Sequence, residues 1–214
     1  MTLDIRPERP DDYDAIARVV AAAFGRALEA ELVARIRASD RYVPELALVA
    51  VEDGAVAGHT MFSYATLVAG EGEERDVLQL SPVAVAPERQ RDGIGGALIR
   101  EGIAIATERR EPLVVVLGHA EYYPRFGFEP CRRHGIEPPH PAMEPNFFVL
   151  PLPGHDARLR GRVVFPPAFD GTRHPALSVS FSRICATPSD STWRQDALGE
   201  QNRRHAAFSS RHRI

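Results

Sequence analysis

The residues best suited to chemistry form a glycine-rich run, Gln90, Arg91, Asp92, Gly93, Ile94, Gly95 and Gly96, between a predicted strand and a predicted helix. A helix N-terminus leaves backbone N–H groups unpaired and carries partial positive charge, which together attract anions. Residues without side chains also let a phosphate approach the backbone closely. We therefore predict that the run binds a pyrophosphate through its main chain.

Two nucleotide-binding motifs with similar glycines match this run poorly. The dinucleotide fingerprint G-x-G-x-x-G requires a third glycine, but Leu98 stands at that position. The phosphate loop G-x-x-x-x-G-K-[ST] requires a lysine, and all 26 basic residues of the chain are arginines. A nucleotide-dependent oxidoreductase that uses Gly93 to Gly96 remains an alternative, and it predicts binding of a dinucleotide.

The elements around this run predict an α/β (α+β) fold with a mixed central sheet flanked by helices. Helical periodicity indicates helices over residues 10–24, 27–38 and 94–109, with a short helix over 118–125. Strand-like runs cover residues 2–6, 46–52, 55–64, 76–85 and 113–117, and further short strands are expected at 146–150 and 161–165. Asp53-Gly54 between two of these runs is typical of a tight hairpin.

Pro82 lies inside the predicted strand 76–85. Proline cannot donate a hydrogen bond to a neighbouring strand, so it predicts a bulge or a local parting of the sheet. A ligand could enter at that defect.

Three segments of the chain resemble the GNAT superfamily of acetyl-CoA-dependent N-acetyltransferases. Residues 85–95 (VAPERQRDGIG) resemble the family's pyrophosphate motif V-x-P-x-x-Q-x-x-G-x-G. Residues 80–85 (LSPVAV) and 118–128 (GHAEYYPRFGF) resemble its YhbS-like branch. The resemblance covers residues 1–168, which implies a GNAT domain there and leaves residues 169–214 as a C-terminal extension, whose composition indicates disorder.

The resemblance implies that the pantetheine arm of acetyl-CoA lies along a sheet edge where two parallel strands part. Backbone groups of Val83, Ala84 and Val85 would bind that arm, and the N–H groups of residues 91–96 would hold the pyrophosphate. A strand N–H near Val83 would also stabilise the oxyanion of the tetrahedral intermediate.

Tyr123, in Tyr-x-x-x-Gly-Phe, is implied to be the general acid that protonates the departing thiolate. Tyr122 is its adjacent rival. Many relatives carry a glutamate base on the strand before the glycines, but Gln79 and Ser81 stand here. A water chain with His119 and Glu121 is the more plausible route for the proton of the amine.

Three other residues have simpler interpretations than catalysis. His59 lies within a predicted strand, so we expect a structural role. Cys131 as an acyl relay is disfavoured, because only His134 lies near it in sequence and the family transfers acyl groups directly. Arg125 is expected either to contact a cofactor phosphate or to pair with an acid.

Composition limits the partners further. The formal net charge of −3 shows none of the basic excess typical of nucleic-acid-binding domains. Two cysteines are too few for a zinc ligand set, and no signal peptide or membrane span is apparent. We expect a cytoplasmic monomer or homodimer without metal, and a tail that is either poorly ordered or a partner-binding arm.

The sequence therefore predicts an enzyme that transfers the acetyl group of acetyl-CoA to a primary amine. Transfer would occur by direct attack in a ternary complex, with a small-molecule or peptide acceptor. A non-catalytic acyl-CoA-binding module is the alternative, because the strand glutamate is missing.

Overall fold

A computed structural model describes residues 3–170, whose centre is one mixed sheet of nine strands. The main path runs β1-β2-β3-β4-β5-β8-β6, and β9 joins β3 to β7. The strands are β1 (Leu3–Pro7), β2 (Tyr42–Glu52), β3 (Ala55–Val68), β4 (Glu74–Val85), β5 (Leu113–Leu117), β6 (Glu129–Pro130), β7 (Ile136–Glu137), β8 (Phe147–Pro151) and β9 (Gly161–Val164). The predicted mixed sheet is confirmed.

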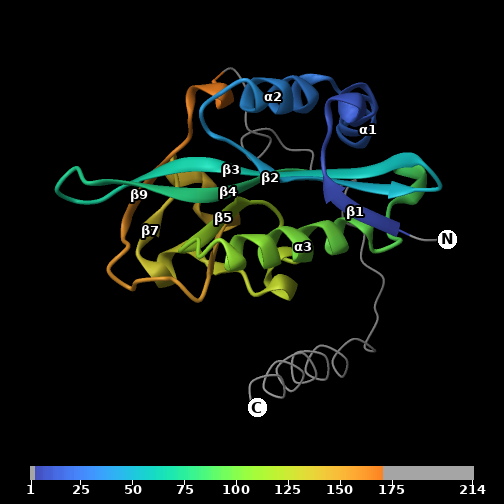
Figure 1. The fold of residues 1–214 in the computed structure, drawn as a ribbon. Helices are drawn as coiled ribbons and strands as arrows, with labels where there is room; N and C mark the ends of the chain where they lie inside the picture. The colour runs from blue at the N-terminus through green and yellow to red at the C-terminus, as the bar shows by residue number, and fades with distance from the viewer. Residues whose placement is uncertain (1–2, 171–214) are drawn as a thin grey trace, which may run out of the picture.

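Helices cover both faces of the sheet (Figure 1). On one face lie α1 (Tyr13–Phe24) and α2 (Leu28–Arg37), and on the other lies α3 (Ile94–Glu108). A buried cluster that includes Ile16, Ile36 and Met61 forms the core under α1 and α2. The core under α3 includes Phe62 and Ile99.

The predicted hairpin at Asp53-Gly54 joins β2 to β3. Both residues have positive φ, 49° and 81°, as a tight two-residue turn of the primed type requires. Glu52 pairs with Ala55 directly across the turn. Local sequence therefore sets the first pairs of this hairpin, and the register shifts further along the strands, between Ala50 and Val51 and between Tyr42 and Ala47.

The parallel strands β4 and β5 pair over a short distance and then part. Leu78 pairs with Val114 and Gln79 with Val115, but β4 continues to Val85 without further pairing to β5. On its other side, β4 places Ser81 and Pro82 opposite the single residue Met61 of β3. The bulge and parting predicted from Pro82 are both present.

Two segments differ from the predicted elements. Residues 118–125 were expected to be a short helix, but only a 3₁₀ turn forms, η3 (Tyr123–Phe126). Pro124 lacks an N–H, and Gly127, with φ of 90°, ends the turn after four residues. Ile136 and Glu137 form the unpredicted strand β7, which pairs with β9. The predicted C-terminal extension lies outside the described residues from residue 171 onward.

Candidate functional site

The glycine-rich run lies where β4 ends and α3 begins. After the 3₁₀ turn η2 (Pro87–Arg89), the chain turns sharply at Arg91 and Gly93, whose φ values are 74° and 84°. Gly93 is the N-cap of α3 and no side chain caps this helix. The first-turn N–H groups of α3 therefore remain available to a bound anion.

Side chains of the run hold its shape. The Gln90 side chain donates from Nε2 to the carbonyl of Val85, over 3.3 Å. Arg89 donates to Asp92 (2.9 Å) and to Glu52 (2.9 Å), so its charge is neutralised within the protein. The loop consequently offers its backbone, rather than the Arg89 guanidinium, to a ligand.

The end of β4, which no longer pairs with β5, meets the first turn of α3 beside Tyr122. A Cβ atom built on Gly95 would lie 3.4 Å from Tyr122 Oη, 3.4 Å from Val85 Cγ2 and 3.7 Å from Val83 Cγ1. Val83 and Val85 are partly exposed, whereas Ala84 is buried in the core under α1 and α2. The structure thus brings Val83, Val85 and Gly95 together, whereas the Ala84 side chain belongs to the core under α1 and α2.

Tyr122 and Tyr123 are neighbours in a turn, and their side chains lie against different parts of the structure. Their rings contact edge to face, with centroids 5.2 Å apart. Tyr122 contacts Phe126 and points its hydroxyl toward Gly95. The Tyr123 ring packs on Phe128 and covers Gly118, leaving no room there for a Cβ atom. Tyr123 therefore lies at the carboxyl end of β5, and Tyr122 beside the glycines.

The loop between β5 and η3 carries His119 and Glu121. The His119 carbonyl accepts hydrogen bonds from the N–H groups of Tyr122 (3.0 Å) and Tyr123 (3.4 Å). His119 is partly exposed and Glu121 is exposed. Both candidate proton acceptors thus lie on the segment that also positions the two tyrosines.

A buried polar pair, of which sequence reasoning identified only Gln79, marks the point where β4 and β5 part. Gln79, the last β4 residue paired to β5, lies opposite Ser63 of β3. Both are buried, and Gln79 Oε1 and Ser63 Oγ have no hydrogen-bond partner within the described part of the chain. Because an unsatisfied buried oxygen costs about 1–3 kcal/mol, such a pair is a functional candidate.

His59 belongs to a closed buried cluster, consistent with the expected structural role. Its Nε2 lies 3.0 Å from Glu8 Oε2. Glu8 also accepts hydrogen bonds from Arg37 (2.7 Å) and Tyr42 (2.8 Å), so the cluster links β2, β3 and α2. Burial lowers the pKa of His59, which is therefore neutral. Burial alone would raise the pKa of Glu8, but hydrogen bonds from His59 and Arg37 outweigh it and lower that pKa to about 2.

Acidification should destabilise the fold through this cluster. The pKa of folded His59 lies below its ordinary value of 6.5, so the unfolded chain binds that proton first and stability falls below about pH 6.5. The stability that Glu8 adds to the fold is fully present above its ordinary pKa of 4.5, and it is lost as the pH falls toward 2. Thermal unfolding midpoints between pH 8 and pH 4 should therefore decline from pH 6.5 downward. His59→Gln should flatten the upper part of that decline, and an unchanged slope would refute the assignment.

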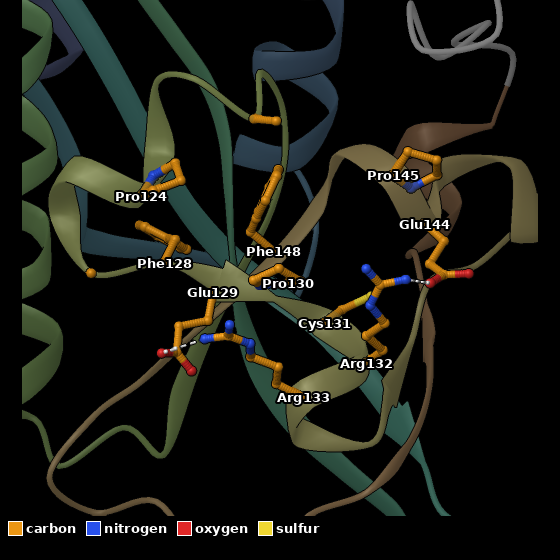
Figure 2. Close-up of a pocket in the computed structure, with 12 residues that line it drawn as sticks. Pro124, Phe128, Glu129, Pro130, Cys131, Arg132, Arg133, Glu144, Pro145 and Phe148 are labelled. Carbon is orange, nitrogen blue, oxygen red and sulfur yellow. Dashed lines mark hydrogen bonds and ion pairs between the residues drawn. The ribbon is translucent and has the colours of Figure 1, made fainter.

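A pocket next to this site contains none of the predicted cofactor-binding residues. Figure 2 shows Pro124, Phe128 and Phe148 on one side and Cys131, with the ion pair Arg132–Glu144, on the other. Cys131 is buried, and burial raises the pKa of its thiol. His134, the base nearest to Cys131 in sequence, contacts Glu129 rather than the thiol: its Nε2 lies 2.9 Å from Glu129 Oε2. These contacts disfavour an acyl relay at Cys131.

Residues 3–170 contain neither a cluster of metal-ligand side chains nor a membrane-spanning helix. No three His, Cys, Asp or Glu side chains there gather in a way that could hold a metal ion. Nor is any helix in that range long and apolar enough to cross a membrane.

Comparisons with known proteins agree on one family. Residues 4–131 match the family model described as an acetyltransferase (GNAT) domain. The uncharacterized N-acetyltransferase YjhQ of Escherichia coli K12 is 42% identical over 134 residues, which are 62% of this chain and 74% of YjhQ. The uncharacterized N-acetyltransferase YhbS of the same strain is 33% identical over 68% of this chain and 84% of its own length.

Two solved structures share the fold. The structure of E. coli YhbS in complex with CoA has a TM-score of 0.71 and 31% identity, covering 78% of this chain and 91% of its own. A GNAT family acetyltransferase from Brucella melitensis, in complex with acetyl-CoA, has a TM-score of 0.65 and 36% identity. It covers 79% of this chain and 99% of its own.

Proposed function

Since the chain belongs to the GNAT acetyltransferase family, we propose that it binds acetyl-CoA between β4, β5 and α3 and acetylates a primary amine. It is an acyltransferase, as the resemblance of residues 85–95 predicts. One observation carries the proposal: the end of β4, which pairs with β3 but no longer with β5, lies directly beside the uncapped N-terminus of α3. That geometry offers an extended edge for the pantetheine arm and backbone donors for the pyrophosphate.

The glycines fit this cofactor. A side chain at Gly95 would fill the space between Val83, Val85 and Tyr122. In the proposed complex, the N–H groups of residues 91–96 hold the pyrophosphate, with Gln90 and Asp92 shaping the loop. Backbone groups of Val83, Ala84 and Val85 hold the pantetheine amides.

The proposed reaction is direct attack of a neutral amine on the thioester carbon. A C–N bond forms, a strand N–H near Val83 stabilises the oxyanion, and the C–S bond then breaks. Tyr123 gives its proton to the departing thiolate, whose conjugate thiol has an ordinary pKa of about 8.5. The amine loses its proton through water toward His119 or Glu121. Gln79, on the strand where many relatives carry a glutamate, cannot take the proton, because a carboxamide is not a base.

Titration calorimetry with acetyl-CoA, followed by thiol release in the presence of an amine panel, tests the proposal. We expect saturable binding, and release of free CoA only with an accepted amine. Binding without release by any small or peptide amine would favour the alternative of a non-catalytic acyl-CoA-binding module, for which the uncharged Gln79 is the supporting observation. No heat and no thermal shift with acetyl-CoA would refute both.

A further inference from the structure

The strand that borders the split in the sheet carries no base. Residues 77–85 of β4 (VLQLSPVAV) include neither an acid nor a histidine. Gln79 is buried, and its Oε1 has no hydrogen-bond partner within residues 3–170. Side chains directly opposite in an antiparallel pair lie on the same face, so Ser63 of β3 lies beside Gln79. This stretch of β4 therefore supplies hydrogen-bonding groups but no proton acceptor.

Ionisable side chains on the neighbouring strand β3 are already committed. His59 is fully buried, and its Nε2 lies 3.0 Å from Glu8. Tyr64 donates its hydroxyl hydrogen bond to Glu111, over 2.7 Å. In the proposed function the proton of the amine leaves through water, toward His119 or Glu121. The arrangement thus suits an amine that is already neutral when it binds.

The pocket of Figure 2 borders the proposed general acid. Pro124 follows Tyr123 in η3 and lines the pocket. Phe128 also lines it, and the Phe128 ring contacts the Tyr123 ring with centroids 5.7 Å apart. The cavity has a volume of about 780 Å³, which lies within the range of ligand pockets. None of the predicted cofactor residues lines it, so it is available to the acceptor.

The lining of this pocket is apolar, and its charges balance. Arg132 pairs with Glu144 over 3.4 Å. Arg133 pairs with Glu129, also over 3.4 Å. Both carboxylates of the lining are therefore neutralised by arginines and leave no excess negative charge to hold an ammonium ion. The apolar side chains are those of Ala120, Pro124, Phe128, Pro130, Pro145 and Phe148.

Primary amines differ widely in how much neutral nucleophile they offer. A lysine-type amine has an ordinary pKa of about 10.4, whereas that of an α-amino group is about 7.7–8.0. At pH 7.5 about 0.1% of the first and about a quarter to two fifths of the second are neutral. An ammonium ion would also lose hydration in an apolar pocket without an unpaired carboxylate to compensate. Both features of the site therefore favour the less basic amine.

We propose that the acceptor is the α-amino group of an amino acid or peptide whose first side chain is apolar and enters this pocket. The inference rests on the proposed function, because it names the acceptor of the same site. The neutral α-amine forms the C–N bond, and the C–S bond then breaks. Nitrogen releases one proton through water toward His119 or Glu121, and the thiolate gains one from Tyr123, so the reaction consumes no further reactant.

Two forms of one peptide test the inference on the whole chain. The peptide Phe-Gly-Gly-Lys amide is prepared with only its α-amine free, the lysine being acetylated, or with only its lysine amine free. Thiol release from acetyl-CoA at pH 7.5 gives kcat/KM for each form. We expect the α-amine form to react at least about tenfold faster, because the greater nucleophilicity of the more basic amine offsets only part of its protonation. A Gly-led α-amine peptide should react about tenfold more slowly than the Phe-led one.

Gln79→Glu tests the role of the missing base. Burial beside Ser63 raises the pKa of a glutamate toward the working pH, as suits a general base. We expect kcat/KM for the lysine-amine form to rise at least about tenfold, which narrows the preference. Gln79→Met is the matched control, because it has a similar volume without a base, and it should keep the wild-type ratio of the two forms. An unchanged ratio in a folded Gln79→Glu protein would refute the argument from β4.

Ala120→Trp tests the pocket, because Ala120 is exposed and lines it. It should lower kcat/KM at least about tenfold for the Phe-led peptide and less than about threefold for the Gly-led one. Ala17→Trp, exposed on α1 and outside the pocket, should affect neither. Equal losses for both peptides in Ala120→Trp would refute the pocket assignment. A wild type that prefers the lysine amine would refute the inference while the proposed function stands, and no thiol release with any amine would overturn both.

Discussion

Gly95→Asp should lower the affinity for acetyl-CoA by at least about a hundredfold while leaving the fold intact. The new Cβ atom would have ordinary contacts, 3.4 Å to Tyr122 Oη and Val85 Cγ2, so its carboxylate would stand in the space between Tyr122 and the end of β4, next to the N–H groups proposed for the pyrophosphate. Two like charges about 5 Å apart repel by roughly 3 kcal/mol at an effective dielectric constant of 20. That repulsion corresponds to the expected loss, which calorimetry measures directly.

The stability of this variant should not fall. Gly95 is the second residue of α3, where an acidic side chain interacts favourably with the helix dipole. Gly70→Asp is a suitable control, because a Cβ atom there would meet nothing within 4 Å. If Gly95→Asp bound acetyl-CoA as tightly as Gly70→Asp does, the pyrophosphate would lie elsewhere and the glycine turn would lose its assigned role.

The parts of this site that could be predicted from sequence are those fixed by local backbone chemistry. Asp53-Gly54 specifies its turn, and Pro82, which has no N–H to donate, shifts the register of β4 against β3. Glycines followed by a helical pattern likewise specify an open helix N-terminus at Gly93. In each case one or two residues restrict the backbone to a single local conformation, so the prediction needs no knowledge of tertiary contacts.

Side-chain neighbours from distant segments could not be predicted in the same way. Glu8 and His59 are separated by 51 positions, and no periodicity indicates that they share a buried cluster. Ser63 became a candidate only when strand register placed it opposite Gln79. The expected helix over residues 118–125 failed because Pro124 and Gly127 together allow just one 3₁₀ turn. The cytoplasmic location and the domain boundary at residue 168 stay predictions.

Tyr123→Phe should lower kcat about a hundredfold and leave the dissociation constant for acetyl-CoA within about twofold. General acid catalysis typically contributes 10²- to 10⁴-fold, and the phenylalanine ring keeps the packing of Tyr123 against Phe128 and Gly118. Thiol release gives kcat, and calorimetry gives the dissociation constant. Both measurements are needed, because a loss of folding or of cofactor binding would otherwise imitate a loss of chemistry.

Tyr122→Phe is the matched comparison, since it removes the same hydroxyl from the adjacent residue. The Tyr122 hydroxyl points toward Gly95, so its removal should act on cofactor affinity and leave kcat nearly unchanged. We therefore expect opposite patterns. Tyr123→Phe should lower kcat, whereas Tyr122→Phe should raise the dissociation constant for acetyl-CoA. If the patterns were exchanged, the thiol of the cofactor would lie beside the first turn of α3. The general acid would then be Tyr122, and the carboxyl end of β5 would serve only to pack Tyr123.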